Sequence, residues 1–267
     1  RSSDLDGTDL GKFLIVKYDK DCTQPTLIEG LTIQNAEHSS EGGGVFIRGN
    51  MTMNLCTITN CKTSSSGGGL YAKGDNADTP AIISNCIIEL CSAGSSGGAA
   101  YLYQNAVMDG CIVRGCQGKY GAIRSHKAGV KVQNCVLHNN SATVDGWPDS
   151  GGIYNETGAE AYNLTVCNNY GAKYAGIHSE GKIYNSVFWG NRAEDGFTDP
   201  VNFISASSAS SDNWADQGFD GESFASLTLS VNNTDAQGPN FKFPTTFVGI
   251  PKNAGEISAM RDRKSVV

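Results

Sequence analysis

A short motif repeated along the chain is the feature that most constrains its fold. The motif covers Leu55–Cys61 and returns clearly as Asn85–Cys91 and Gly110–Cys116, with weaker copies elsewhere. Its apolar centre falls at Ile33, Ile58, Ile88, Val113, Leu137, Val166 and Phe188. The steps run from 22 residues (Val166 to Phe188) to 30 residues (Ile58 to Ile88). A period in this range is typical of repeat proteins in which each repeat is one supersecondary unit.

Two further columns of apolar residues alternate with the first one. One follows small residues, as in Gly43–Phe46 and Gly68–Tyr71, and the other precedes the cysteine motif, as at Met53 and Ile83. Each repeat therefore holds three short strands, and within them Cys56 and Ile58 share one face by period-2 alternation. We predict an all-β fold over residues 1–200, a single-stranded right-handed parallel β-helix (a solenoid) of about seven rungs.

These motifs resemble those of the right-handed parallel β-helix (pectin-lyase-like) superfamily. Within it, Gly151–Ile153 and Phe188–Asn191 are most similar to the repeats of polymorphic outer-membrane proteins of bacteria. The resemblance covers about residues 5–195 and implies a secreted or surface-exposed bacterial protein used in adhesion or glycan contact. The same superfamily holds polysaccharide lyases and glycoside hydrolases, so the fold alone does not decide the function.

Charge and composition exclude several classes of partner. The 20 Lys and Arg residues are outnumbered by 27 Asp and Glu residues, which gives a net charge of −7. Nucleic acids and anionic membranes select clustered cations, so we expect neither as the main partner. No run of about 18 apolar residues is present, so we expect no transmembrane segment.

The nine cysteines allow three interpretations. Cys56, Cys86, Cys111 and Cys135 would form one inward ladder, and Cys61, Cys91 and Cys116 a second one that asparagines continue at positions 140, 169 and 191. Stacked core thiols are favoured, because an aliphatic residue lies inside each cysteine pair and buried cysteine packs as a small apolar side chain. Disulfides and a metal site are the alternatives. We expect the asparagines to satisfy buried backbone groups at a turn.

One column carries aromatic and polar side chains on the outward side of its strands. It comprises Phe46, Tyr71, Tyr101, Arg124, Tyr154 and His178. In-register stacking would align these side chains along one face, where rings, guanidinium and imidazole could contact a sugar chain. The alternative is structural, since outward aromatic residues also stack on one another. We name these six residues as the candidate ligand-binding set.

Signals for catalysis are weak. Asp75 and Asp78, like Asp145 and Asp149, lie in loops whose composition is typical of turns. Asn233–Asp235 is similar to one polygalacturonase motif, but the accompanying motifs of that family are missing. The four histidines follow no metal-binding spacing. We therefore predict no catalytic residues, no metal and no cofactor.

The last part of the chain departs from the repeat. We expect irregular rungs or a strap over residues 201–261. Residues 262–267 resemble a translated sequencing adapter, so we expect a non-native tail there. The preferred function is a non-catalytic protein of the extracellular space or the bacterial outer-membrane surface that binds a polysaccharide or a host-surface glycan. The alternative is a polysaccharide lyase or glycoside hydrolase.

Overall fold

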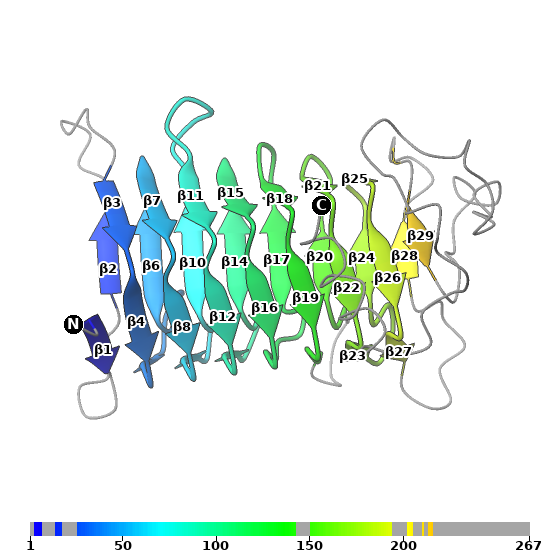
Figure 1. Cartoon of the computed structure of the whole chain (residues 1–267), viewed down its shortest axis with the longest axis horizontal. Helices are drawn as coiled ribbons and strands as arrows, with labels where there is room; N and C mark the ends of the chain where they lie inside the picture. The colour runs from blue at the N-terminus through cyan, green and yellow to red at the C-terminus, as the bar shows by residue number, and fades with distance from the viewer. Residues whose placement is uncertain are drawn as a thin grey trace, which may run out of the picture.

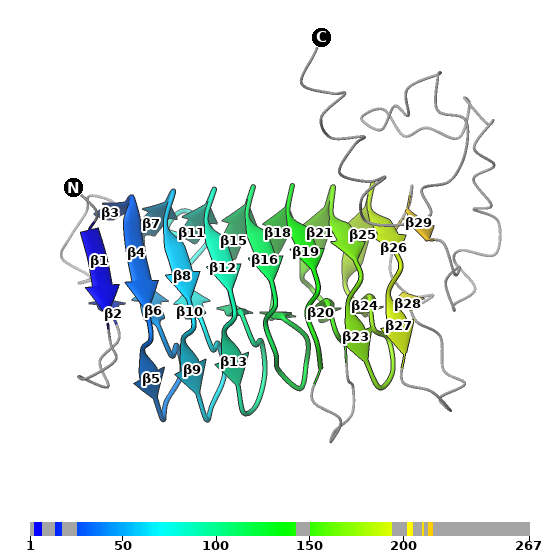
Figure 2. The ribbon, with the colours of Figure 1, turned by 60° about the horizontal axis from the view of Figure 1, so that its bottom comes forward.

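The structure is a computed structural model of the whole chain. It describes residues 3–6, 14–17, 26–142, 150–193, 202–204, 210 and 213–215. Every regular element in these ranges is a β-strand. Figure 1 shows the strands stacked side by side along one axis, and Figure 2 shows the faces of the coil that they form.

Three long sheets make up the coil. Sheet A contains β1 (Ser3–Asp6), β4 (Leu31–Gln34), β8 (Thr57–Thr59), β12 (Ile87–Glu89), β16 (Ile112–Arg114), β19 (Val136–His138), β22 (Thr165–Cys167), β26 (Val187–Trp189) and β29 (Trp214–Ala215). Sheet B contains β2 (Leu14–Lys17), β6 (Val45–Arg48), β10 (Leu70–Lys73), β14 (Ala100–Tyr103), β17 (Ile123–His126), β20 (Ile153–Asn155), β24 (Ile177–Ser179) and β28 (Asn202–Ile204). Sheet C contains β3 (Thr26–Glu29), β7 (Met51–Asn54), β11 (Ala81–Ser84), β15 (Ala106–Asp109), β18 (Lys131–Gln133), β21 (Glu160–Tyr162) and β25 (Lys182–Tyr184).

Two short sheets lie at the corner between sheets A and B (Figure 2). The first contains β5 (Glu37–His38), β9 (Lys62–Thr63) and β13 (Ser92–Ala93), and the second β23 (Tyr170–Gly171) and β27 (Arg192–Ala193). The strand pairs of all these sheets are parallel, and each strand pairs with its counterpart one rung away. The predicted β-helix of about seven rungs, with three main strands per rung, is therefore confirmed.

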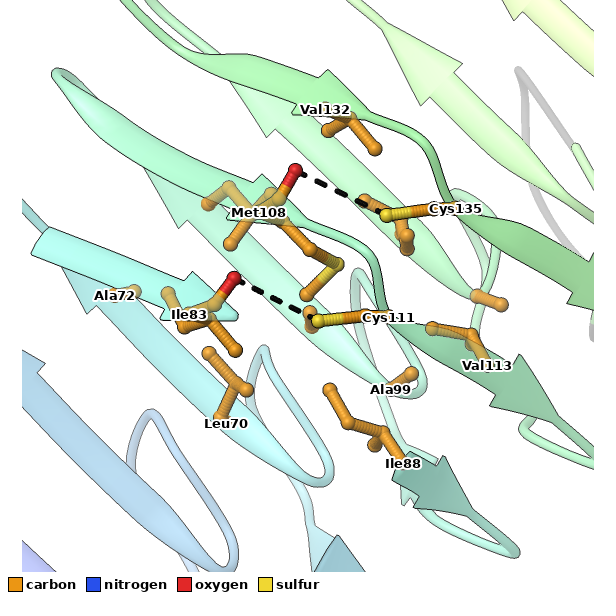
Figure 3. Close-up of a cluster of buried hydrophobic side chains, with 14 of the residues drawn as sticks. Leu70, Ala72, Ile83, Ile88, Ala99, Met108, Cys111, Val113, Val132 and Cys135 are labelled. Atoms are coloured by element: carbon orange, nitrogen blue, oxygen red, sulfur yellow. Dashed lines mark hydrogen bonds between the residues drawn. The ribbon is translucent and has the colours of Figure 1, made fainter. Parts of the chain in front are cut away.

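The core lies inside the coil and is built from the three predicted apolar columns. Ile58, Ile88 and Val113 of sheet A are fully buried, and so are Ile83 and Met108 of sheet C. Figure 3 shows such inward side chains packed together between the sheets. Because one residue from each rung occupies each column, the core is a set of stacked rows that run along the coil.

The cysteines belong to this core. The eight cysteines among the described residues are all free and buried, which confirms the favoured interpretation for them. The Cys111 thiol donates to the Ile83 carbonyl at 3.6 Å, and the Cys135 thiol to the Met108 carbonyl at 3.8 Å (Figure 3). Hydrogen bonding between thiols and burial raise the pKa of Cys86 to about 12. The Cys86 thiol is therefore protonated and inert at neutral pH.

Asparagine and cysteine play the same part in the second ladder. The Cys61 amide donates to the Cys91 sulfur at 3.5 Å, and the Cys116 amide donates to Asn140 Oδ1 at 3.0 Å. Farther along, the Asn140 amide donates to Asn169 Oδ1 at 2.9 Å, and Asn169 in turn to Asn191 Oδ1 at 3.0 Å. The prediction that these asparagines satisfy buried backbone groups is confirmed.

The residue just before each ladder position adopts a left-handed conformation. Asn60, Asn139 and Asn168 have φ between 52° and 55°, and Gly115 has φ 63°. Asparagine and glycine tolerate this region, whereas a leucine pays about 1 kcal/mol there. Leu90 breaks the pattern, because it has φ 55° and is 61% exposed.

Replacing this leucine should stabilise the protein. We expect Leu90→Asn to raise the free energy of unfolding by about 1 kcal/mol, since it removes the backbone strain and an exposed apolar side chain together. Urea denaturation of the variant and the parent protein measures the difference. The Leu27→Asn variant is the control, because Leu27 is 59% exposed without a left-handed backbone. A gain of equal size at both positions would contradict the strain argument.

Candidate functional site

The six candidate ligand-binding residues lie in one row on the outer side of sheet B. The strand register pairs Phe46 with Tyr71 and Tyr71 with Tyr101. It continues from Tyr101 to Arg124, Tyr154 and His178. Phe203 of β28 pairs with His178 and extends the row by one rung. The predicted alignment of these side chains is thus present, and we call the row the aromatic ladder.

The rings of the aromatic ladder stack on one another. The ring centroids of Phe46 and Tyr71 are 4.9 Å apart with an angle of 9° between the planes, and those of Tyr71 and Tyr101 are 5.5 Å apart. Tyr71 and Tyr154 are consequently buried although their strand positions face outward, whereas Phe46, Tyr101 and Arg124 stay half-exposed. The inner rings therefore present their edges and hydroxyl groups, and not their faces, to a ligand.

Burial of the tyrosine hydroxyls keeps them protonated. It raises the pKa of Tyr101 to about 12, with the Arg124 charge opposing the rise. It also raises the pKa of Tyr71 and of Tyr154 well above the usual range for tyrosine. Each hydroxyl can thus both donate and accept a hydrogen bond at neutral pH.

Arg124 interrupts the run of rings and organises a polar network. Its Nε and a terminal nitrogen bind Glu156 Oε1 at 2.6 Å and 2.5 Å, and its other terminal nitrogen donates to the Ser96 hydroxyl at 2.8 Å. The guanidinium carbon lies 4.6 Å from the ring centroid of Tyr120 and 5.5 Å from that of Tyr101. A charge-assisted pair that is also held by rings has little freedom to move.

The other oxygen of the Glu156 carboxylate holds a histidine. His126 Nδ1 is hydrogen-bonded to Glu156 Oε2. Burial lowers the pKa of His126, and the nearby Glu156 charge opposes the shift. The imidazole is therefore neutral at pH 7, with its proton on Nδ1 toward the carboxylate and a lone pair on Nε2. This carboxylate–imidazole arrangement can accept a proton or a hydrogen bond from a ligand.

His126 belongs to a second outward row that lies beside the aromatic ladder. Tyr103 pairs with it across the strands, and the two ring centroids are 5.2 Å apart. Lys73, which pairs with Tyr103, places its ammonium 5.2 Å from the centroid of that tyrosine ring. The two rows together form what we call the sheet B face, a continuous surface of rings, hydroxyl groups and charges.

Comparison with known proteins supplies the family. Residues 15–193 match the family model described as a right handed beta helix region. The chain belongs to the right-handed β-helix family. No curated protein and no solved structure has significant similarity to it.

Several residues of the sheet B face were not predicted from the sequence. Tyr103 and His126 lie two positions after Tyr101 and Arg124, so the period-2 rule places them on the same side of the sheet. Glu156 lies just beyond the end of β20. Its position in a loop, outside the repeated motifs, did not indicate that it would bind Arg124 and His126. Its contact with Arg124 joins residues 32 positions apart.

The acidic loop residues that the sequence analysis considered for catalysis have structural roles where the structure describes them. Asp75 lies 3.8 Å from Arg48 in an exposed ion pair, and the Asn76 side chain accepts from the Asp78 amide at 2.9 Å, which confirms a turn there. Asp145, Asp149 and Asn233–Asp235 lie outside the described residues. Strands β28 and β29 continue sheets B and A past residue 200. The rest of the predicted 201–261 region and the 262–267 tail are also outside the described part.

Within the described residues, no group of three or more His, Cys, Asp or Glu side chains is arranged to hold a metal ion. The same residues contain no helix of the length and apolar character that a membrane crossing requires.

Proposed function

We propose that this β-helix is a non-catalytic binding protein, secreted or displayed on a bacterial surface, whose sheet B face contacts a glycan. The observation that supports the proposal is the array of hydroxyl, guanidinium, imidazole and ring groups held in register along one face. Binding to such an array costs little side-chain entropy, because stacking and the Arg124–Glu156–His126 network have already fixed the side chains.

The half-exposed members of the face are the ones that a glycan would touch. Phe46, Tyr101 and Tyr103 offer ring surface to the apolar side of a sugar. Arg124 and His126, whose side chains are 20% and 17% exposed, are placed to hydrogen-bond its hydroxyl groups. The buried Tyr71, Tyr154 and His178 act by supporting these neighbours.

Affinity electrophoresis through embedded polysaccharides tests the proposal. We expect the parent protein to be retarded by at least one neutral or acidic polysaccharide. The Tyr101→Ala/Tyr103→Ala variant should bind about tenfold more weakly, which corresponds to about 1.4 kcal/mol. The matched control is Tyr162→Ala/Tyr184→Ala, because these tyrosines stack in the same way, at 5.3 Å, on sheet C.

Two results would contradict a glycan-binding sheet B face. One is an equal loss of retardation in the two double variants, which would mean that the face has no special role. The other is the lack of retardation of the parent protein by any polysaccharide in a panel that includes cellulose-, pectin- and chitin-derived polymers. Circular dichroism of each variant establishes that the strands are retained.

A second candidate function has one observation in its favour. The Glu156 carboxylate fixes the tautomer of His126 and leaves Nε2 as a base, which is the arrangement of a general acid–base catalyst. A polysaccharide lyase could use this group as its base, whereas a glycoside hydrolase canonically uses a pair of carboxylates. The same gels distinguish the two functions. Degradation of the embedded polysaccharide by the parent protein, but not by His126→Gln, would identify an enzyme.

A further inference from the structure

A buried histidine lies near one end of the aromatic ladder, one rung before Phe203. His178 is 5% exposed, although its position on β24 faces outward. Its ring centroid lies 4.7 Å from that of Tyr154, 4.7 Å from that of Tyr174 and 5.0 Å from that of Phe203. Tyr154 is one rung back and Phe203 one rung ahead, so the imidazole is enclosed by three rings, which we call the His178 cage.

One carboxylate lies near the cage in the described part of the chain. Glu180 Oε1 is 3.9 Å from His178 Nε2, and it accepts a hydrogen bond from the Tyr154 hydroxyl at 3.3 Å. Glu180 also accepts from Thr157 at 3.4 Å and is itself 43% exposed. Among the described residues, the titratable side chains that contact the imidazole include Glu180 on its own segment, Tyr154 on β20 and Tyr174 before β24. The Arg124 guanidinium lies behind Tyr154, 5.7 Å from the centroid of that ring.

We infer that the His178 cage is an acid-operated latch of the sheet B face: proton uptake by His178 opens the cage and disorders the ladder from Tyr154 onward. The effect on ligand binding rests on the function proposed above, whereas the opening itself does not. The observations that carry the inference are the enclosure of an ionisable ring by apolar ring surface and its position as a stacking member of the ladder.

The physical reason is the cost of placing a charge inside the cage. Burial lowers the pKa of His178 to about 4, from about 6.5 for an unfolded histidine. The folded state therefore binds this proton less readily than the opened state. The stabilisation that the neutral ring supplies is complete above pH 6.5 and is lost progressively as the pH falls from 6.5 toward 4. A protonated ring would leave the cage toward Glu180 and water, and Tyr154 would lose its stacking partner.

Near-ultraviolet circular dichroism of the protein alone tests the latch. We expect the tyrosine signal of the parent protein to fall between pH 6.5 and pH 4. It should persist to a pH about one unit lower in His178→Phe and His178→Gln, which cannot take up the proton. The control is His38→Gln, because His38 lies on β5, outside sheet B, and its Nδ1 accepts from the Ser40 amide at 3.0 Å. The same acid midpoint in the parent and both His178 variants would overturn the inference.

Hydrogen exchange locates the opening. Amide exchange over residues 150–184 should accelerate by about tenfold between pH 6.5 and pH 4.5 after correction for the intrinsic pH dependence, while exchange over residues 81–116 should not. Uniform acceleration along the coil would overturn the latch, because it would indicate general acid unfolding.

Glycan binding is measured separately, so that the two proposals can fail independently. Retardation by a bound polysaccharide should weaken at least tenfold between pH 7 and pH 4.5 in the parent protein and less than threefold in His178→Phe. Equal weakening in both proteins would overturn the regulatory role. Absence of retardation at every pH contradicts the binding function, while the dichroism still decides the latch.

Discussion

Truncation of Ile88 should lower the free energy of unfolding by about 4 kcal/mol, measured as Ile88→Ala by urea denaturation. Ile88 is fully buried in sheet A (Figure 3). The strand register places it between Ile58 and Val113. The truncation leaves a cavity in the core. The side chains around it cannot move far into this cavity, because each is held in place by its own strand pairing. The loss therefore includes the cavity and not only the transfer of the side chain to water.

The neighbouring isoleucine is the matched control. Ile87 has the same chemical structure and lies in the same strand, but its side chain points outward and is half-buried. We expect Ile87→Ala to cost about 1 kcal/mol. Similar losses at both positions would mean that the inward and outward faces of sheet A are assigned wrongly.

Loss of one asparagine from the second ladder should be about as costly as loss of a core side chain. Asn169 is buried, and its Oδ1 accepts from the Asn140 backbone amide at 2.9 Å and from Asn140 Nδ2 at 3.0 Å. Its own Nδ2 donates to the Leu137 carbonyl at 3.1 Å and to Asn191 Oδ1 at 3.0 Å. Asn169→Ala removes these four hydrogen bonds from the core and takes away the acceptor of the Asn140 backbone amide, so we expect a loss on the order of 4 kcal/mol in urea denaturation.

A cysteine at the same position should restore part of this stability. Cys91 occupies the equivalent place, where its sulfur accepts from the Cys61 amide. Its thiol also donates to the Ile58 carbonyl. We expect Asn169→Cys to cost about half as much as Asn169→Ala. Equal losses in the two variants would show that the ladder hydrogen bonds contribute little and that side-chain volume decides.

The periodic part of the fold could be predicted closely from the sequence. Ile58, Ile88 and Val113 recur with their flanking cysteines, and a parallel coil is the arrangement that brings equivalent residues of successive repeats into register. The asparagine ladder could also be predicted, because Asn140 and Asn169 take the place of cysteine in the motif. Each of these features depends on one position in the repeat, which a single sequence displays many times.

The candidate site could be predicted only in part. The row from Phe46 to His178 follows from the repeat, and the structure aligns it as expected. The network around Arg124 does not follow from it, because Glu156 and Ser96 occupy loop positions whose side chains are placed by the turns of two other rungs. Repeat periodicity carries no information about such single, non-repeated contacts.

The sequence by itself determined the kind of fold, the inward residues and the row of aromatic side chains, because strand alternation and in-register stacking are properties of the repeat. Only the tertiary structure decided how the side chains of this row are packed and paired. It turned the ring of Tyr71 against its neighbours, enclosed His178 among Tyr154, Tyr174 and Phe203, and held His126 on a carboxylate. These outcomes depend on side-chain packing across rungs, where the distance between rings and charges, and not their order along the chain, sets burial and protonation.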